Sequence, residues 1–170
     1  MSPTKLINYL RLLILGMWLG AAVFFSAIVA PGAFAVLRSY QSFNAGEIAG
    51  ALVNRNLAAI NVSGFVVGLV LFASAFVNFR KVQLLTFLVE MVSVTAVSLA
   101  TAVGNWIIAP KIRALRLTLS TPIDQLSVSD PRRVSFDNLH AYSVKALSVA
   151  MIAALLGFVM MALRARGDAK

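Results

Sequence analysis

The chain of 170 residues contains no cysteine, only six acidic residues and a single histidine. The absence of cysteine excludes disulfides, thiolate metal sites and thiol chemistry. One histidine cannot supply both axial ligands of a bis-histidine haem, and no paired carboxylates are present for acid–base catalysis. Motifs for a nucleophile elbow, a phosphate-binding loop or a zincin helix are also missing. We therefore expect no enzymatic activity, no catalytic residue, no metal site and no other cofactor.

Charge is scarce along most of the chain. Hydrophobic residues make up 60% of the sequence and charged residues 12%, against roughly 45–50% and about 25% in a soluble domain. The apolar residues gather in four runs, each long enough for a helix to cross a ~30 Å hydrocarbon core. The sequence predicts an all-α integral membrane protein, a four-transmembrane-helix bundle with helical extensions on the side of the loop between spans three and four. We assign one domain over residues 1–170, with spans at about residues 10–37, 56–79, 82–110 and 138–163.

The net charge of +9 would suggest nucleic acid as the partner of a soluble protein. Most lysines and arginines lie in the predicted loops and tails, where they face anionic lipid headgroups. We therefore expect the lipid bilayer as partner and no nucleic acid, and the sequence identifies no soluble partner. An even number of spans places both termini on one side of the membrane. The compact segments Arg80-Lys81 and Arg164-Ala165-Arg166 next to span ends favour the cytoplasm for that side.

The connections between the spans differ in length. The segment Phe79-Arg80-Lys81-Val82 is so short that it predicts an antiparallel hairpin of spans two and three. Residues 45–53 predict a short interfacial helix before span two, and residues 111–117 keep helical spacing beyond span three. Asp130-Pro131 is a good helix start, because the carboxylate accepts from free backbone N–H groups and proline at the first helical position loses no hydrogen bond.

Two ionisable residues fall inside predicted spans, where burial is costly and function is therefore a default hypothesis. Glu90 lies in span three and Lys145 in span four, and we predict that both are buried. Their expected depths differ by only about 8 Å, so one interpretation is a direct ion pair. The alternatives are a protonated Glu90 inside the bundle and a Lys145 whose ammonium extends to the interface along its own stem.

More polar residues gather toward the side opposite the termini. Asn61 lies near the start of span two, Asn105 near the end of span three, and His140 at the start of span four. One hypothesis is a polar vestibule formed by Asn61, Asn105, His140 and Lys145. The alternative is an interfacial belt, because asparagine, histidine and aromatic residues are common at headgroup depth.

Two pairs of glycines predict close helix packing. Gly16 and Gly20 in span one, like Gly64 and Gly68 in span two, lie one turn apart on the same face. They favour packing of span one against span two, because sequential spans usually lie next to each other. An interface between copies in a homo-oligomer is the alternative interpretation.

Several local patterns together resemble the transmembrane-protein-205-like domain family. The patterns are Trp18-Leu19-Gly20-x-x-x-Phe24-Phe25 followed by Pro31, Ala45-Gly46-x-Ile48-Ala49-Gly50, Asn105-x-x-x-x-Pro110, and Phe136-x-x-Leu139-His140-x-x-Ser143. The resemblance covers most of the chain. It implies a four-span membrane domain of no established biochemical activity, and it transfers no catalytic residue.

Three functions of different classes are compatible with these patterns. The leading hypothesis is transport or permeation of a small solute or ion through the polar vestibule. A membrane scaffold that binds a partner is the second, with a basic surface formed by Arg113, Arg116, Arg132 and Arg133. The third is a copper- or haem-linked redox protein, which requires His140 as a ligand.

Overall fold

The computed structural model describes residues 3–40, 44–76, 83–119 and 121–167, and every regular element in these ranges is a helix. The elements in chain order are α1 (Pro3–Phe24), η1 (Phe25–Val29), α2 (Ala30–Ser39), α3 (Ala45–Ala75), α4 (Leu84–Ala102), η3 (Val103–Ile108), α5 (Ala109–Leu117), η4 (Ile123–Gln125) and α6 (Pro131–Gly167). Four stretches are long and apolar enough to cross a membrane: Lys5–Ser39, Ala45–Ala75, Leu84–Leu117 and Pro131–Ala165. The predicted all-α bundle of four membrane-spanning helices is confirmed, whereas the predicted hairpin turn at 79–82 lies outside the described residues.

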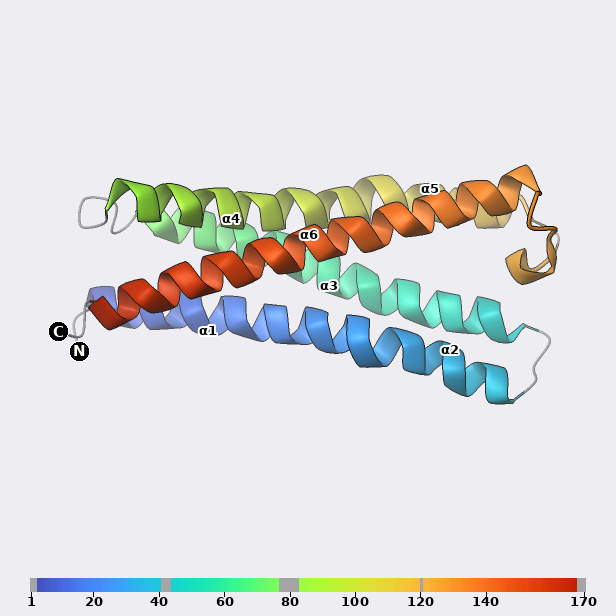
Figure 1. Cartoon of the computed structure of the whole chain (residues 1–170), viewed down its shortest axis with the longest axis horizontal. Helices are drawn as coiled ribbons and strands as arrows, with labels where there is room; N and C mark the ends of the chain where they lie inside the picture. Colours follow the sequence, from blue (N-terminus) through green and yellow to red (C-terminus); the bar gives the residue numbers. More distant parts are fainter. Residues whose placement is uncertain (1–2, 41–43, 77–82, 120, 168–170) are drawn as a thin grey trace.

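The four long helices form an elongated bundle (Figure 1). The start of α1 and the end of α6 lie at one end of it, which we call the terminal end. The helix formed by α1, η1 and α2 runs parallel to the helix formed by α4, η3 and α5, while α3 and α6 run in the opposite direction. Helix α1 packs against α3 and α6, and α4 packs against the same two helices. Spans one and three therefore face each other across the centre of the bundle.

Spans one and three share a local irregularity. Each contains a π-helical segment, η1 or η3, that ends two residues before a proline, Pro31 or Pro110. Proline cannot donate a hydrogen bond to the carbonyl one turn earlier, and a π-helical turn lets the helix continue past such a position. Because the two spans run parallel, the two irregular turns lie toward the same end of the bundle.

The buried residues of these two spans follow a common register. Arg11 and Glu90 each lie 20 residues before the proline of their span, and both are buried. Further buried residues along the bundle centre also form pairs whose two members lie equally far from the proline of their own span. These pairs are Leu15 with Val94, Trp18 with Val97, Ala22 with Thr101, and Phe25 with Gly104. The equal spacing places matching layers of spans one and three at equal depth.

Small residues let the other helices approach this centre. Ala150, Ala153 and Ala154 of α6 are buried in the apolar core beside Leu15 and Trp18. Helix association in lipid depends on such close packing, since lipid tails are as apolar as a protein core. A hydrogen bond also connects α1 with α3, because the indole N–H of Trp18 donates to the Ile60 carbonyl at 3.0 Å.

The four predicted packing glycines contact different helices. A Cβ at Gly64 would lie 2.6 Å from the Trp18 ring, so this glycine does bring spans one and two together. Gly68 faces Ser98 of α4, and Gly16 faces the Phe158 ring of α6. A Cβ at Gly20 would meet no atom within 4 Å, and this glycine is exposed. The expectation that all four join spans one and two is therefore wrong, because span one also packs against α6.

The helices extend beyond the hydrocarbon core at the end opposite the termini, which we call the loop end. Spans one and four contain 35 residues each, or about 50 Å at 1.5 Å per residue, against a hydrocarbon core of ~30 Å. Residues 12–31, 56–75 and 91–110 are free of charge, and each segment matches the thickness of the core. Helix α2, the start of α3, α5 and the start of α6 therefore extend beyond the hydrocarbon core, in agreement with the predicted helical extensions.

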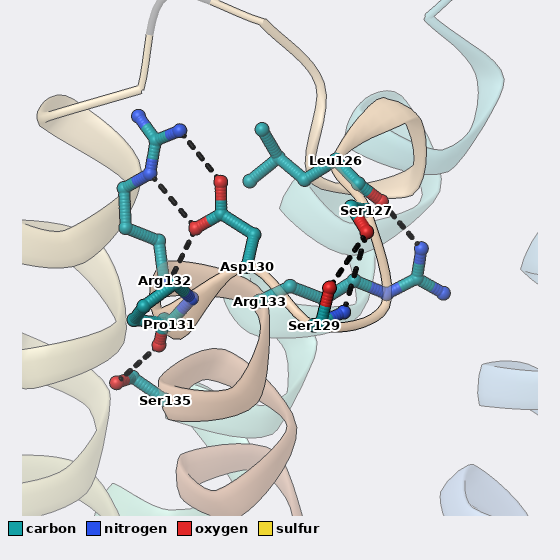
Figure 2. A network of polar contacts seen from close by, with 8 residues as sticks. All are labelled: Leu126, Ser127, Ser129, Asp130, Pro131, Arg132, Arg133 and Ser135. Atoms are coloured by element: carbon teal, nitrogen blue, oxygen red, sulfur yellow. Dashed lines mark hydrogen bonds and ion pairs between the residues drawn. The ribbon is translucent and has the colours of Figure 1, made fainter.

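The projecting part of α6 begins at the predicted residues. The Asp130 carboxylate accepts from the backbone N–H of Arg132 at 2.8 Å and from its guanidinium at 3.1 and 2.7 Å (Figure 2). Arg133 Nη1 donates to the Leu126 carbonyl at 2.8 Å, which fastens the preceding loop to the helix. Asp130 thus caps α6, and Pro131 occupies the first helical position.

Candidate functional site

A cluster of charged side chains occupies the bundle centre near the terminal end. Glu90 of α4 is fully buried and forms ion pairs with Arg11 of α1 and, at 3.3 Å, with Arg164 of α6. Arg11 also donates to the Leu71 carbonyl of α3 at 3.3 Å. All four spans therefore meet at this cluster, which we call the charge cluster.

The charge cluster replaces the hypothetical pair of Glu90 and Lys145. Glu90 is buried as predicted, but the Lys145 side chain is exposed on the outer face of α6. Ser143 and Leu147, two residues before and after it, are buried, so Lys145 lies on the opposite face of the helix. Its ammonium lies 5.7 Å from the Tyr142 ring, one turn closer to the loop end. The prediction of a buried Lys145 is wrong, because the register of α6 turns this residue outward.

The charge cluster is closed. The crevice beside Arg11, Met161 and Arg164 leaves no space for a water molecule. Glu90 is buried completely, and the two arginines expose only 4% and 11% of their side-chain surface. Removing one member of such a buried set leaves the others uncompensated in a medium of low dielectric. The arrangement thus serves to hold the four helices in register and offers no place for a ligand.

The residues of the hypothetical polar vestibule do not surround one space. Asn61 is buried and packs against Gly104, with its amide nitrogen 2.9 Å from a Cβ built on that glycine. Asn105 is half-buried, while His140 and Lys145 are exposed. Of these residues, His140 alone lines the two cavities described below. The glycine in η3 explains this outcome for Asn61, because the missing side chain admits the amide into the bundle.

Two adjoining cavities lie between α2, α3 and α6. The first, here called the polar cavity, has a volume of about 140 Å³ at the loop end and is lined by charged residues of α3, α5 and η4. The second, here called the apolar cavity, has a volume of about 300 Å³ and reaches toward the middle of the bundle. Phe34, Val53 and His140 line both. A volume near 300 Å³ is typical of the smaller ligand sites in proteins.

The apolar cavity arises from the course of the helices. Helix α1 packs closely against α6, but its continuation α2 follows α3 instead. Helices α2 and α6 therefore separate toward the loop end, as Figure 1 shows. The wedge between them is lined mostly by apolar side chains, among them Phe25, Pro31, Leu57, Leu147 and Met151.

The polar cavity depends on two glycines of α3. The Asp124 carboxylate of η4 lies against Gly46, in the space that a side chain there would occupy. The Arg116 guanidinium of α5 lies in the same way against Gly50, with Nη2 2.5 Å from a Cβ built on that glycine. Arg116 also lies over the Phe136 ring, 5.3 Å from its centroid. The sequence pattern around Gly46 and Gly50 thus serves to admit two charged side chains.

The polar cavity contains no assembled metal site. In the described part of the chain, no three histidine, aspartate or glutamate side chains gather closely enough to hold a metal ion. His140 instead stacks against Phe136, with ring centroids 6.2 Å apart and planes 9° from parallel.

Sequence reasoning missed Arg11, Arg164, Arg116 and Asp124 as parts of these sites. Arg11 and Arg164 lie where charged residues normally flank a span, so their positions at the span ends did not indicate burial. For Arg11, the equal spacing of Arg11 and Glu90 from Pro31 and Pro110 was an available signal, because parallel spans with that spacing bring the two side chains to one depth.

A family described as a domain of unknown function, DUF4149, matches residues 13–119 of the chain. The chain belongs to this family. The match covers most of span one together with spans two and three, whereas α6 lies beyond it. The description of the family names no activity, so function has to be argued from the cavities and the charges. Comparisons with curated proteins and with solved structures found no match.

Proposed function

We propose that the protein is a transport protein of the membrane, and that the two adjoining cavities hold the molecule it moves. The observation that carries this proposal is the adjacency of the polar cavity at the loop end and the apolar cavity between α2 and α6, which share Phe34, Val53 and His140. A cavity that contains charged side chains beside an apolar one suits a membrane-soluble, amphiphilic substrate better than a free ion. The proposal thus keeps the transport class expected from the sequence and replaces the polar vestibule by these cavities.

The residues that carried the family resemblance support the same location. Gly46, Gly50, Phe136 and His140 line the polar cavity, and Pro31 lines the apolar cavity. These residues come from three separate segments of the sequence. We propose that the relation to the transmembrane-protein-205-like family is genuine and that these positions form its shared site.

The orientation belongs to the same proposal. Both termini lie in the cytoplasm, so the loop end and its polar cavity face the other side of the membrane. The short basic segments beside span ends at the terminal end support this orientation.

Transbilayer movement of a fluorescent lipid tests the proposal directly. Liposomes with and without the purified protein contain a trace of phospholipid labelled with a nitrobenzoxadiazole group, and dithionite added outside reduces the label of the outer leaflet. Without transport about half of the fluorescence remains, since dithionite does not cross the bilayer. We expect the protein to bring most of the label within reach of the reagent.

A pair of variants locates the path. Ser148 lines the apolar cavity, whereas its neighbour Val149 is exposed on the outer face of α6. Ser148→Phe should fill the wedge and abolish the additional loss of fluorescence, and Val149→Phe should leave it unchanged. Protein-containing liposomes that behave like empty ones would refute the proposal. Passage of an entrapped ion without lipid movement would refute the amphiphilic substrate.

A further inference from the structure

The polar cavity contains charged side chains that form no ion pair in the described residues. Arg116, Glu47 and Asp124 all line it, yet no ion pair joins any two of them in the described residues. The Nε atom of Arg116 is buried and has no hydrogen-bond acceptor. Burying such a donor without a partner costs free energy, so an acceptor from a bound molecule would stabilise the site.

The positive and negative groups are separated along α3. Arg116 lies against Gly50 and Asp124 against Gly46. These glycines are four residues apart, which is about 6 Å along a helix axis. Glu47 lies next to Gly46 and adds a second carboxylate at the negative end. The cavity therefore offers one cationic and one anionic contact point at a distance that a small zwitterionic group can bridge.

The adjoining apolar cavity supplies room for a hydrocarbon chain. It shares Phe34, Val53 and His140 with the polar cavity, and its other lining residues come from η1, α2, α3 and α6. A molecule that fits both compartments has a zwitterionic head and an apolar tail. The polar cavity begins at Asn54 and Ile112, next to the uncharged segments 56–75 and 91–110, where lipid headgroups adjoin the hydrocarbon core.

We infer that the two cavities bind a phospholipid with a primary ammonium headgroup, of the phosphatidylethanolamine class. Its phosphate accepts hydrogen bonds from Arg116, its ammonium donates to Asp124 and Glu47, and one acyl chain lies in the apolar cavity. A primary ammonium suits the two carboxylates because it has three N–H donors, which a quaternary ammonium lacks. This inference rests on the proposed function in that it names the substrate class of the same cavities.

Native mass spectrometry of the intact protein in detergent measures the binding. The probes are phosphatidylethanolamine, phosphatidylcholine and phosphatidylglycerol with identical acyl chains, titrated separately and in competition. We expect phosphatidylethanolamine to bind about tenfold more tightly than either of the others, the effect of about one charge-assisted hydrogen bond. Equal retention of all three lipids would overturn the inference.

Charge substitutions show which contact selects the headgroup. Arg116→Gln should weaken binding of all three lipids, because each contains a phosphate. The double variant Glu47→Gln, Asp124→Asn should abolish only the preference for phosphatidylethanolamine. Asp124→Lys should reverse the preference toward phosphatidylglycerol, a change of selectivity that a mere loss of stability cannot produce. Arg113→Gln is the matched control, since Arg113 is exposed on the same helix and does not line either cavity.

Two further results separate the possible explanations. Displacement of the lipid by soluble phosphoethanolamine at similar concentration would assign the site to a free ligand and overturn the lipid identity. Selective binding without transbilayer movement would leave the inference standing and remove only the transport proposal. Lipid movement without headgroup selectivity would support the transport proposal and overturn the inference of a phosphatidylethanolamine site.

Discussion

Glu90 shows how one buried side chain can connect all four spans. It is fully buried and pairs with Arg11 and Arg164, and Arg11 reaches the Leu71 carbonyl of α3. Glu90→Gln would remove the negative charge between two buried guanidinium groups. We expect a loss of stability of about 3–5 kcal/mol, as for other buried pairs deprived of one partner. Thermal unfolding in mild detergent, followed by circular dichroism, measures it.

The control for this prediction is Arg113→Gln, which removes an exposed charge and should change stability by less than about 0.5 kcal/mol. A double-mutant cycle with Arg11→Met separates the interaction from the cost of each single change. A Glu90→Gln protein as stable as the control would contradict the role assigned to the charge cluster.

Gly64 and Gly20 form a natural pair for testing helix packing. A methyl group at Gly64 would lie 2.6 Å from the Trp18 ring and 2.8 Å from Thr101, whereas one at Gly20 would meet nothing within 4 Å. Gly64→Ala should therefore destabilise the bundle by about 1–3 kcal/mol through overpacking. Gly20→Ala should be neutral or stabilising by up to about 1 kcal/mol, since alanine favours the helix. Melting temperatures of the two variants, with Trp18 fluorescence as a local signal, decide between these effects.

At the scale of elements, the start of α6 depends on a charged cap. Asp130 accepts from the backbone and the guanidinium of Arg132, and these hydrogen bonds lower its pKa from 3.8 to about 2. A carboxyl whose pKa is lower in the folded state stabilises that state above the unfolded pKa. Its contribution is therefore complete above about pH 4 and is lost as the pH falls through about 2. Carbon-13 NMR titration of the Asp130 carboxyl checks the pKa.

Replacing the cap gives a second measure of the same element. Asp130→Ala should increase amide hydrogen exchange in the first turn of α6 by a few fold, because that turn loses its side-chain acceptor. Exchange near Ala150, in the buried part of the helix, should not change. Faster exchange along the whole of α6 would show that the cap controls more than its own turn.

The prolines distinguish a local property of an element from one that depends on packing. Pro31 and Pro110 each lack a backbone N–H donor, and the structure has π-helical segments that end two residues before them. The divergence of α2 from α6, which forms the apolar cavity, depends instead on the packing of α2 against α3. No pattern within span one encodes this divergence, because it results from contacts between residues far apart in the chain.

At the scale of the whole molecule, the bundle presents its loop end on one side of the membrane. The absence of cysteine permits a clean test with single substitutions. Ser39→Cys and Val128→Cys lie on exposed parts of the loop end. With the termini in the cytoplasm, both should react with a membrane-impermeant maleimide in intact cells.

Leu155→Cys is the control for this experiment. Leu155 lies in the uncharged part of α6 and faces outward, so lipid should protect it from the reagent in intact and in permeabilised cells. Labelling of Ser39→Cys and Val128→Cys only after permeabilisation would reverse the orientation.

The sequence by itself determined the environment and the class of fold. Runs of about 20 uncharged, apolar residues match the thickness of the hydrocarbon core, and they form helices there because every backbone group must be paired in lipid. The sequence also determined the start of α6 at Asp130-Pro131, because capping depends on neighbouring residues alone.

The tertiary structure decided which polar residues face one another. Glu90 pairs with Arg11 rather than with Lys145, because the rotational register of α6 turns Lys145 outward while the parallel course of spans one and three brings Arg11 to the depth of Glu90. The cavities likewise depend on where α2 and α6 separate and on which side chains Gly46 and Gly50 admit. Hydropathy is a property of each segment, whereas pairing and cavity shape depend on distances between segments, which the packed bundle alone sets.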